Sequence, residues 1–103
     1  MRVLVVVNAK DAPAGLVAER IAARGGAIVM VLPHDGAPLP ETPTGYDGLV
    51  VLGGTQDAWD DADFPAFAAI RRLCRMFDKQ GRPVLAICLG AQLLAQALSL
   101  IHI

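Results

Sequence analysis

The run Val3-Leu4-Val5-Val6-Val7 is apolar throughout, with no polar residue alternating along it. Such a run is typical of a strand buried on both faces, as in a parallel sheet covered by helices. Three further apolar stretches, at residues 27–32, 48–52 and 83–87, are also predicted to be strands, and the one at 27–32 is expected to be buried like the first. The chain therefore offers four candidate strands.

Helical patterns separate these strands. One lies between Pro13 and the pair Gly25-Gly26, and another begins near Asp63 or Pro65 and stops at Gly81. The apolar positions of this second stretch recur at helical spacing on one face: Phe67, Ile70, Cys74 and Phe77. A last helix is expected from about Leu89 or Gly90 onward. Alternating strands and helices predict an α/β fold with a doubly wound, flavodoxin-like or Rossmann-like parallel sheet in three layers. The proline-rich residues 33–45 are expected to form an extended surface loop.

Length, composition and charge exclude several classes of protein. The 103 residues suit a single domain, and 54% hydrophobic against 18% charged residues excludes a disordered chain. A net charge of −1 argues against nucleic-acid and anionic-membrane partners. The apolar run at the N-terminus is too short for a signal-peptide core or a membrane span. Without a secretory signal, Cys74 and Cys88 are expected to be free thiols in a cytoplasmic protein.

The segment Ala86-Ile87-Cys88-Leu89-Gly90-Ala91-Gln92 falls at a predicted strand-to-helix junction. Small residues two before and two after Cys88 permit a nucleophile elbow, a tight turn in which we expect a positive φ at the cysteine. A helix N-terminus beside Cys88 would favour the thiolate. The N–H groups of Leu89 and Gly54 are the candidate donors to an oxyanion. The alternative is a cysteine that merely packs between strand and helix.

These residues also carry a resemblance to a known family. The stretch 84–95 resembles the nucleophile motif of class I glutamine amidotransferases. Residues 50–54 followed by Trp59-Asp60-Asp61 are similar to that family's oxyanion-loop segment. The chain looks most like the stand-alone, GMP synthase-like members, and the resemblance spans residues 1 to about 98.

The resemblance implies a role for each matching residue. Cys88 would attack the side-chain amide of glutamine to form a γ-glutamyl thioester and release ammonia. The backbone amides of Leu89 and Gly54 would hold the oxyanion, and Gln92 would help to hold the glutamine substrate. No cofactor and no metal is implied. A synthase or other ammonia acceptor remains an open partner.

The sequence departs from the family pattern at several positions. Ala86 stands where the family usually has glycine, and Thr55 stands where it often has proline. The family's catalytic histidine and glutamate come far downstream of the cysteine, which fits neither His34 nor His102. We therefore expect residues 1–98 to be the N-terminal part of the domain, truncated after the nucleophile helix and inactive alone. Residues 99–103 are expected to be a non-native tail.

Two other functions stay open from the sequence. One is a related cysteine hydrolase on the same fold, such as a γ-glutamyl peptidase or a DJ-1-like protein. Gln92 favours glutamine over these, and Glu19, the one acidic residue of the first helix, lacks the DJ-1-like surroundings. The other is a flavodoxin-like binding domain without catalysis.

The remaining chemistry-bearing residues are expected to be structural. Four carboxylates are interpreted as a solvated loop and a helix cap rather than a cation site: Asp57, Asp60, Asp61 and Asp63. Arg71, Arg72 and Arg75 are predicted to form a solvated helix face. Cys74 shares the apolar stripe of its helix and is expected in the core.

Overall fold

The computed structural model describes residues 1–7, 15–33, 38–52, 66–87 and 89–98. These ranges contain four strands and three helices, as the sequence predicts. In chain order they are β1 (Arg2–Val6), α1 (Gly15–Ala23), β2 (Ala27–Val31), β3 (Gly48–Val51), α2 (Ala66–Lys79), β4 (Val84–Ala86) and α3 (Leu89–Ala97).

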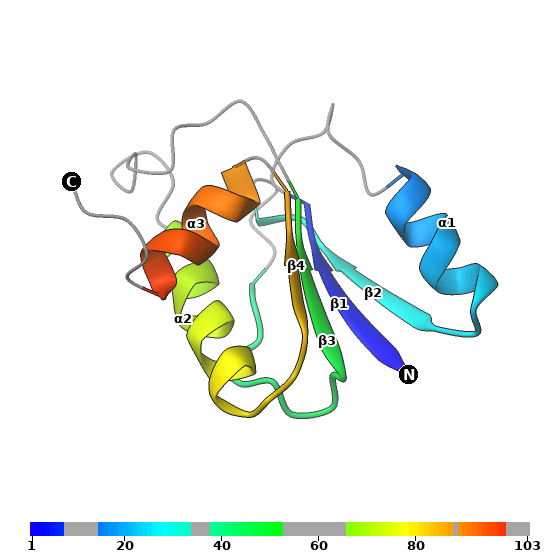
Figure 1. The fold of residues 1–103 in the computed structure, drawn as a ribbon, viewed down its shortest axis with the longest axis horizontal. Helices are drawn as coiled ribbons and strands as arrows, with labels where there is room; N and C mark the ends of the chain where they lie inside the picture. Colours follow the sequence, from blue (N-terminus) through cyan, green and yellow to red (C-terminus); the bar gives the residue numbers. More distant parts are fainter. Residues whose placement is uncertain (8–14, 34–37, 53–65, 88, 99–103) are drawn as a thin grey trace.

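The strands form one parallel sheet in the order β2-β1-β3-β4. Leu4 of β1 pairs with Leu49 of β3, and Val51 of β3 pairs with Ala86 of β4. Figure 1 shows α2 and α3 on one face of the sheet and α1 on the other. The predicted α/β class with three layers and a parallel sheet is confirmed.

The two inner strands, β1 and β3, are buried on both faces. Alternate residues face α2 and α3, where Leu4, Val6 and Val51 belong to the larger apolar cluster. The intervening residues, among them Val5 and Val50, face the side of α1. This double burial is why residues 3–7 form an uninterrupted apolar run, since neither face of the strand meets water.

The amphipathic pattern of α2 corresponds to its buried face. Five of its side chains are buried: Phe67, Ile70, Leu73, Cys74 and Phe77. The helix ends at Lys79, and the turn that follows contains Gly81, whose φ of 68° lies in the left-handed region that favours glycine. There the N–H of Gly81 donates to the carbonyl of Asp78 at 3.0 Å, and that of Arg82 donates to Phe77 at 2.9 Å. None of the helices in the described ranges is long and apolar enough to cross a bilayer.

The sheet edges depart from the expectation of buried strands. Residues 27–32 were expected to be buried, but β2 is an edge strand and Met30 is 53% exposed. The sequence could not reveal this, because strand order in space is not strand order in the chain. At the other edge of the described sheet, Leu85 and Ile87 are 50% and 37% exposed.

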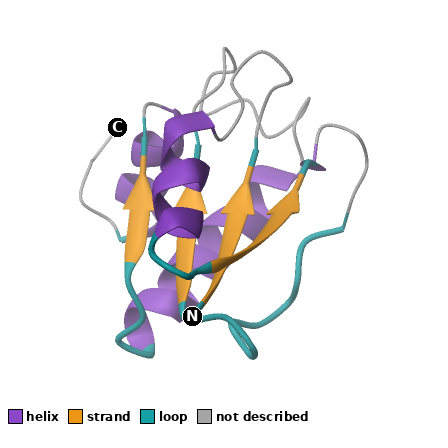
Figure 2. Ribbon diagram, turned by 90° about the vertical axis from the view of Figure 1, so that its right-hand side faces the viewer, coloured by secondary structure: helices purple, strands orange, loops and turns teal. Residues whose placement is uncertain are grey.

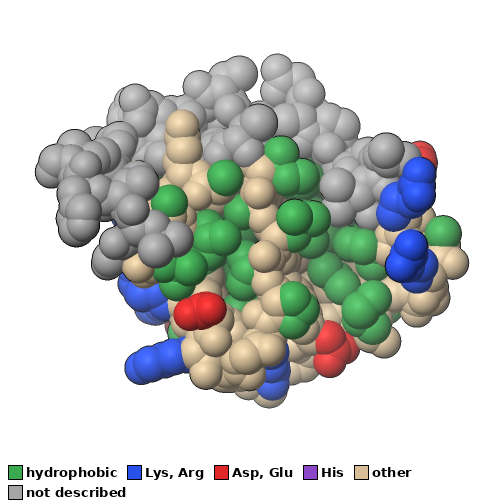
Figure 3. All heavy atoms as spheres, in the orientation of Figure 1, with side chains coloured by type: hydrophobic (Ala, Val, Ile, Leu, Met, Phe, Trp, Pro, Cys, Tyr) green, Lys and Arg blue, Asp and Glu red, His purple; other side chains and the backbone are tan. Residues whose placement is uncertain are grey.

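The exposed residue of β4, Leu85, continues an apolar face of the sheet. Leu85 pairs with Val50, a buried member of the cluster on the α1 side. Figure 2 shows α1 in front of the middle of the sheet, leaving the β4 edge uncovered on that face. Figure 3 shows hydrophobic side chains gathered between the two helical layers where β4 faces the viewer.

The described part of the proline-rich loop is tied to the body of the protein. Pro43 is fully buried, so the prediction of a plain surface loop is wrong at this position. Nη1 of Arg82 donates to the backbone carbonyls of Pro43 and Tyr46, the latter at 2.8 Å. The backbone N–H of Arg2 donates to Oδ2 of Asp47 at 2.8 Å, and the N–H of Asp47 donates back to the Arg2 carbonyl at 2.7 Å. These bonds fix the position of the residues directly before β3.

Candidate active site

The candidate site lies at the carboxyl ends of β3 and β4. The two strands are parallel neighbours, and their last residues, Val51 and Ala86, are paired. The segment containing Gly54 therefore leaves β3 at the same edge where the chain leaves β4 toward Cys88. Sites of open α/β sheets lie at this edge. Gly54 and Cys88 themselves fall outside the described residues, so their assigned roles stay predictions.

The passage from β4 to α3 is short. β4 ends at Ala86 and α3 begins at Leu89, so two residues separate strand from helix. The N–H of Ile87 donates to the carbonyl of Val51 at 3.0 Å, and the N–H of Gly90 donates to the carbonyl of Ile87 at 2.9 Å. The predicted strand-to-helix junction is confirmed. The positive φ expected at Cys88 is not tested by the described residues.

Gly90 explains why this junction requires a small residue. A Cβ built on Gly90 would stand 2.2 Å from the carbonyl oxygen of Val51 and 2.8 Å from its carbonyl carbon. Both contacts are to backbone, which cannot rotate away as a side chain can. Ala86, on the other side of the cysteine, is half-buried against the apolar cluster under α2 and α3. The small residues of the motif thus match close packing between helix and sheet.

The start of α3 gives the site its electrostatic character. Leu89 is the first helical residue, so its N–H belongs to the first turn, where backbone donors have no partner within the helix. The positive end of the helix dipole lies at this terminus. Gln92, one turn further along, is exposed, whereas its neighbour Leu93 is fully buried. Gln92 is accessible from solvent, and its predicted contact with substrate remains a prediction.

Cys74, the other thiol, is in the core as expected. It is fully buried among the apolar side chains of α2 and β3. Desolvation raises the pKa of the Cys74 thiol from 9.0 to about 11, and the nearby positive charge of Arg75 opposes this rise in part. A thiol with such a pKa stays protonated at neutral pH. Cys74 is therefore unsuited to act as a nucleophile.

The arginines of α2 differ from one another in surroundings. Arg72 and Arg75 are exposed, as predicted for a solvated face. Arg71 is partly buried, and its Nη1 donates to Oε1 of Gln96 at 3.2 Å, so the prediction of a solvated side chain is wrong for this residue. The bond links α2 to α3 across 25 positions of sequence. Sequence reasoning missed Gln96, because nothing in its neighbours signals a distant partner.

The other candidate residues lie outside the described residues: His34, His102, Thr55 and the carboxylates from Asp57 to Asp63. Within the ranges that the structure describes, no group of three or more His, Cys, Asp or Glu side chains is arranged to hold a metal ion.

The fold and this edge define an α/β protein with a cysteine placed in sequence between a parallel strand and the helix that follows it. The sequence profile of the family described as Glutamine amidotransferase class-I matches residues 5–100. The chain therefore belongs to the class I glutamine amidotransferase family.

Solved structures agree with this assignment. A glutamine amidotransferase from Thermotoga maritima is 26% identical with a TM-score of 0.85, over 95% of this chain and 43% of that one. A glutamine amidotransferase from Methylobacillus flagellatus is 28% identical with a TM-score of 0.87, over 93% of this chain and 38% of that one. The present chain thus spans about two fifths of the length of these structures. No curated protein matches it.

Proposed function

We propose that this chain carries the nucleophile half of a glutamine amidotransferase site, which hydrolyses the side-chain amide of glutamine through a thioester on Cys88. Family membership supports the general activity. The observation that carries the assignment to this residue is the packing of Gly90 on the Val51 carbonyl. That close approach lets α3 begin directly after Cys88, beside the strand that leads to Gly54.

The proposed chemistry uses the thiolate of Cys88. Its sulfur attacks the side-chain carbonyl carbon of glutamine, and the carbonyl electron pair moves onto oxygen. The N–H groups of Leu89 and Gly54 would stabilise that oxyanion. The carbon–nitrogen bond then breaks, the leaving nitrogen takes a proton, and ammonia departs. Water hydrolyses the resulting thioester to glutamate and restores the cysteine.

Two features favour glutamine as the substrate. Both solved structures cited above bear the name glutamine amidotransferase. Gln92 also presents a side-chain amide on the exposed side of α3, one turn from the oxyanion donor Leu89. We propose that it helps to orient the glutamine, with a synthase or another acceptor receiving the ammonia.

The proton transfers need a histidine held by a carboxylate. The histidines of the 103 residues are His34 and His102, and we assign neither this role. We therefore propose that the 103-residue chain does not turn over glutamine alone. Loss of a triad partner removes several orders of magnitude in rate.

The test is a glutaminase assay on the 103-residue chain beside its Cys88→Ala variant. Equal ammonia release from both is expected, because the base is missing. Cys88-dependent release would contradict the incompetence of the chain while supporting Cys88 as the nucleophile. A longer reading frame that supplies a histidine and a glutamate should restore turnover. Such a frame whose activity survives Cys88→Ala would contradict the nucleophile assignment.

A further inference from the structure

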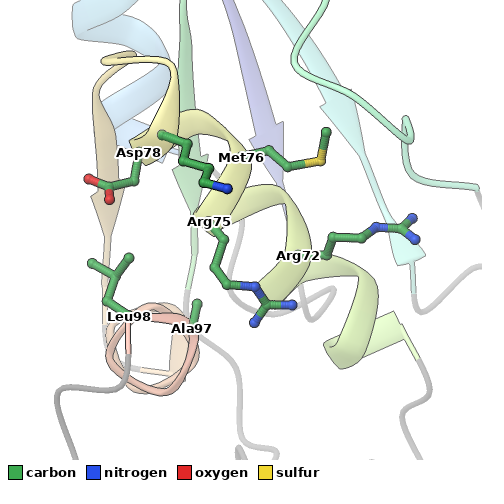
Figure 4. Close-up of a pocket in the computed structure, with 7 residues that line it drawn as sticks. Arg72, Arg75, Met76, Asp78, Ala97 and Leu98 are labelled. Atoms are coloured by element: carbon green, nitrogen blue, oxygen red, sulfur yellow. The ribbon is translucent and has the colours of Figure 1, made fainter.

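A groove lies between the C-terminal half of α2 and the end of α3, on the outer side of the helical layer. We call it the basic groove. α2 contributes Arg72, Arg75, Met76, Lys79 and one carboxylate, Asp78, to its lining. The last residue of α3, Ala97, and the residue after it, Leu98, complete the lining. Its volume is about 380 Å³. Figure 4 shows Arg75 reaching from α2 toward the end of α3, whereas Arg72 extends from α2 in the direction away from α3.

The cations of the basic groove follow the pitch of the helix. Arg72, Arg75 and Lys79 are spaced by three and four residues, so they line one side of α2 over roughly 10 Å. All three side chains are exposed. The groove has three cations against the single carboxylate of Asp78, whereas the whole chain has a net charge of −1. Positive charge is thus concentrated at this surface of an otherwise acidic chain.

The floor of the basic groove is apolar. Met76 is half-buried, Ala97 is buried at 5% exposure, and Leu98 is half-buried. Methionine is a flexible side chain that adapts to different apolar partners. A second hollow lies beside the first and shares Asp78 and Leu98 with it. It adds Leu94 to the lining, so the apolar floor continues toward the start of β4.

An apolar floor with cations repeated at helical pitch is complementary to an amphipathic helix that has carboxylates beside its apolar stripe. We propose that the basic groove binds an acidic amphipathic helix of a protein partner. The apolar stripe of that helix would cover Met76 and Leu98, and its carboxylates would pair with Arg72, Arg75 and Lys79.

Nucleic acid fits the basic groove less well. Binding to phosphate backbones relies on a broad basic surface, whereas this chain has an isoelectric point near 6.0. The rim has three cations over a short span, and the floor is a strip of methionine and aliphatic carbon. This floor offers no aromatic face on which bases could stack.

The test uses the full 103-residue chain and a synthetic amphipathic helix with a leucine stripe flanked by glutamates. A second peptide, with lysine in place of each glutamate, is the charge control. Amide chemical shifts map the binding site, and fluorescence anisotropy gives the affinity. We expect the shifts to cluster on residues 72–79 and 94–98, with no binding of the lysine peptide.

Two double variants with the same change in charge serve as the test and its matched control. Arg72→Glu with Arg75→Glu should weaken binding of the glutamate peptide by about tenfold or more. Arg20→Glu with Arg24→Glu alters exposed arginines at and just beyond the end of α1 by the same charge and should leave the affinity within about twofold. The two pairs of substitutions are exposed, so both variants should fold.

Four results would overturn the proposal. The first is no binding of the glutamate peptide. The second is shifts centred on Leu85 and Ile87, which would mean adhesion to the exposed apolar face of β4. The third is an equal loss of affinity in both variants, which would mean a general charge effect. Displacement of the peptide from residues 72–79 by a single-stranded oligonucleotide at lower concentration would assign the groove to nucleic acid instead.

Discussion

The backbone of Gly90 lies against the carbonyl of Val51, with a space between them smaller than a methyl group needs. A Cβ on Gly90 would stand 2.2 Å from the Val51 oxygen, far inside the contact distance of carbon and oxygen. The same oxygen accepts the N–H of Ile87 at 3.0 Å. One carbonyl of β3 thus touches the chain on both sides of Cys88, and this relationship sets where α3 can begin.

Replacing Gly90 with alanine should therefore destabilise the fold, which is the opposite of the usual effect of this substitution in a helix. Glycine to alanine within a helix normally stabilises by about 1 kcal/mol, because alanine has the higher helix propensity. Gly90→Ala should instead lower the free energy of unfolding by roughly 1–3 kcal/mol, since the methyl group meets backbone. Urea unfolding measures this. Ala91→Ser, at an exposed position of the same helix, is the control and should change stability by less than about 1 kcal/mol. A stabilised Gly90→Ala chain would contradict the close approach.

Cys74 should give the chain a characteristic alkaline instability. Its pKa is about 11 in the fold and 9.0 in an ordinary thiol, so the unfolded chain loses the proton first as pH rises. Between these values the unfolded state binds fewer protons, and the free energy of unfolding falls with pH. The loss should be on the order of 2–3 kcal/mol by pH 11 and absent below pH 9. Cys74→Ala should be less stable at neutral pH but should lack this contribution to the slope, measured as the difference between the two unfolding curves. Equal slopes would contradict the buried, protonated thiol.

Arg82 should stabilise the fold through the loop before β3. Its guanidinium donates to the carbonyls of Pro43 and Tyr46. Arg82→Met keeps much of the side-chain volume but removes these charge-assisted bonds, at an expected cost of about 1.5–3 kcal/mol. Limited proteolysis should then cut residues 38–47 faster. The exposed Arg24→Met is the matched control and should behave like the parent chain. Unchanged cleavage in Arg82→Met would show that the loop does not depend on this residue.

The apolar face of β4 should make the chain self-associate. Leu85 is exposed on β4, the edge strand of the described sheet, and Ile87 is exposed directly after it. Exposed apolar edges are sites of strand-to-strand association. Leu85→Lys should lower the apparent mass in size-exclusion chromatography and sedimentation, whereas Met30→Lys, on β2 at the opposite edge, should have a smaller effect. A parent chain that is a monodisperse monomer with a sharp, reversible melting transition would contradict this prediction.

Much of the fold was predictable because local pattern and tertiary role coincide. Residues 3–7 are apolar at every position because β1 is covered on both faces. The stripe from Phe67 to Phe77 repeats at helical spacing because one side of α2 packs on the sheet. Gly81 marked the end of α2 because the cap needs a left-handed residue.

The features that escaped prediction are those that join distant positions. The exposure of Met30 follows from strand order, which no local pattern encodes. The bonds of Arg82 span 36 and 39 residues, and the bond between Arg71 and Gln96 spans 25. A charged or amide side chain in a helix has the same local pattern whether it meets water or a remote partner.

The candidate site, too, was predictable from the sequence only in part. The spacing around Cys88 was sufficient to predict a strand-to-helix junction, and α3 indeed begins at Leu89. The physical need for Gly90 became visible only with Val51 beside it. The backbone conformation at Cys88 and the donor at Gly54 remain predictions, since both depend on residues beyond the described ranges.

The reaction rate of the Cys88 thiol tests the central claim most directly. The folded chain and a free peptide of residues 84–92 are treated with a glutamine-like electrophile near neutral pH, and mass spectrometry follows each adduct over time. A thiol at a helix N-terminus has a lowered pKa and a larger thiolate fraction. We predict that Cys88 in the folded chain reacts faster than in the peptide, while Cys74 reacts only after unfolding. A Cys88 that reacts no faster than the peptide, or a folded chain labelled first at Cys74, would contradict the account.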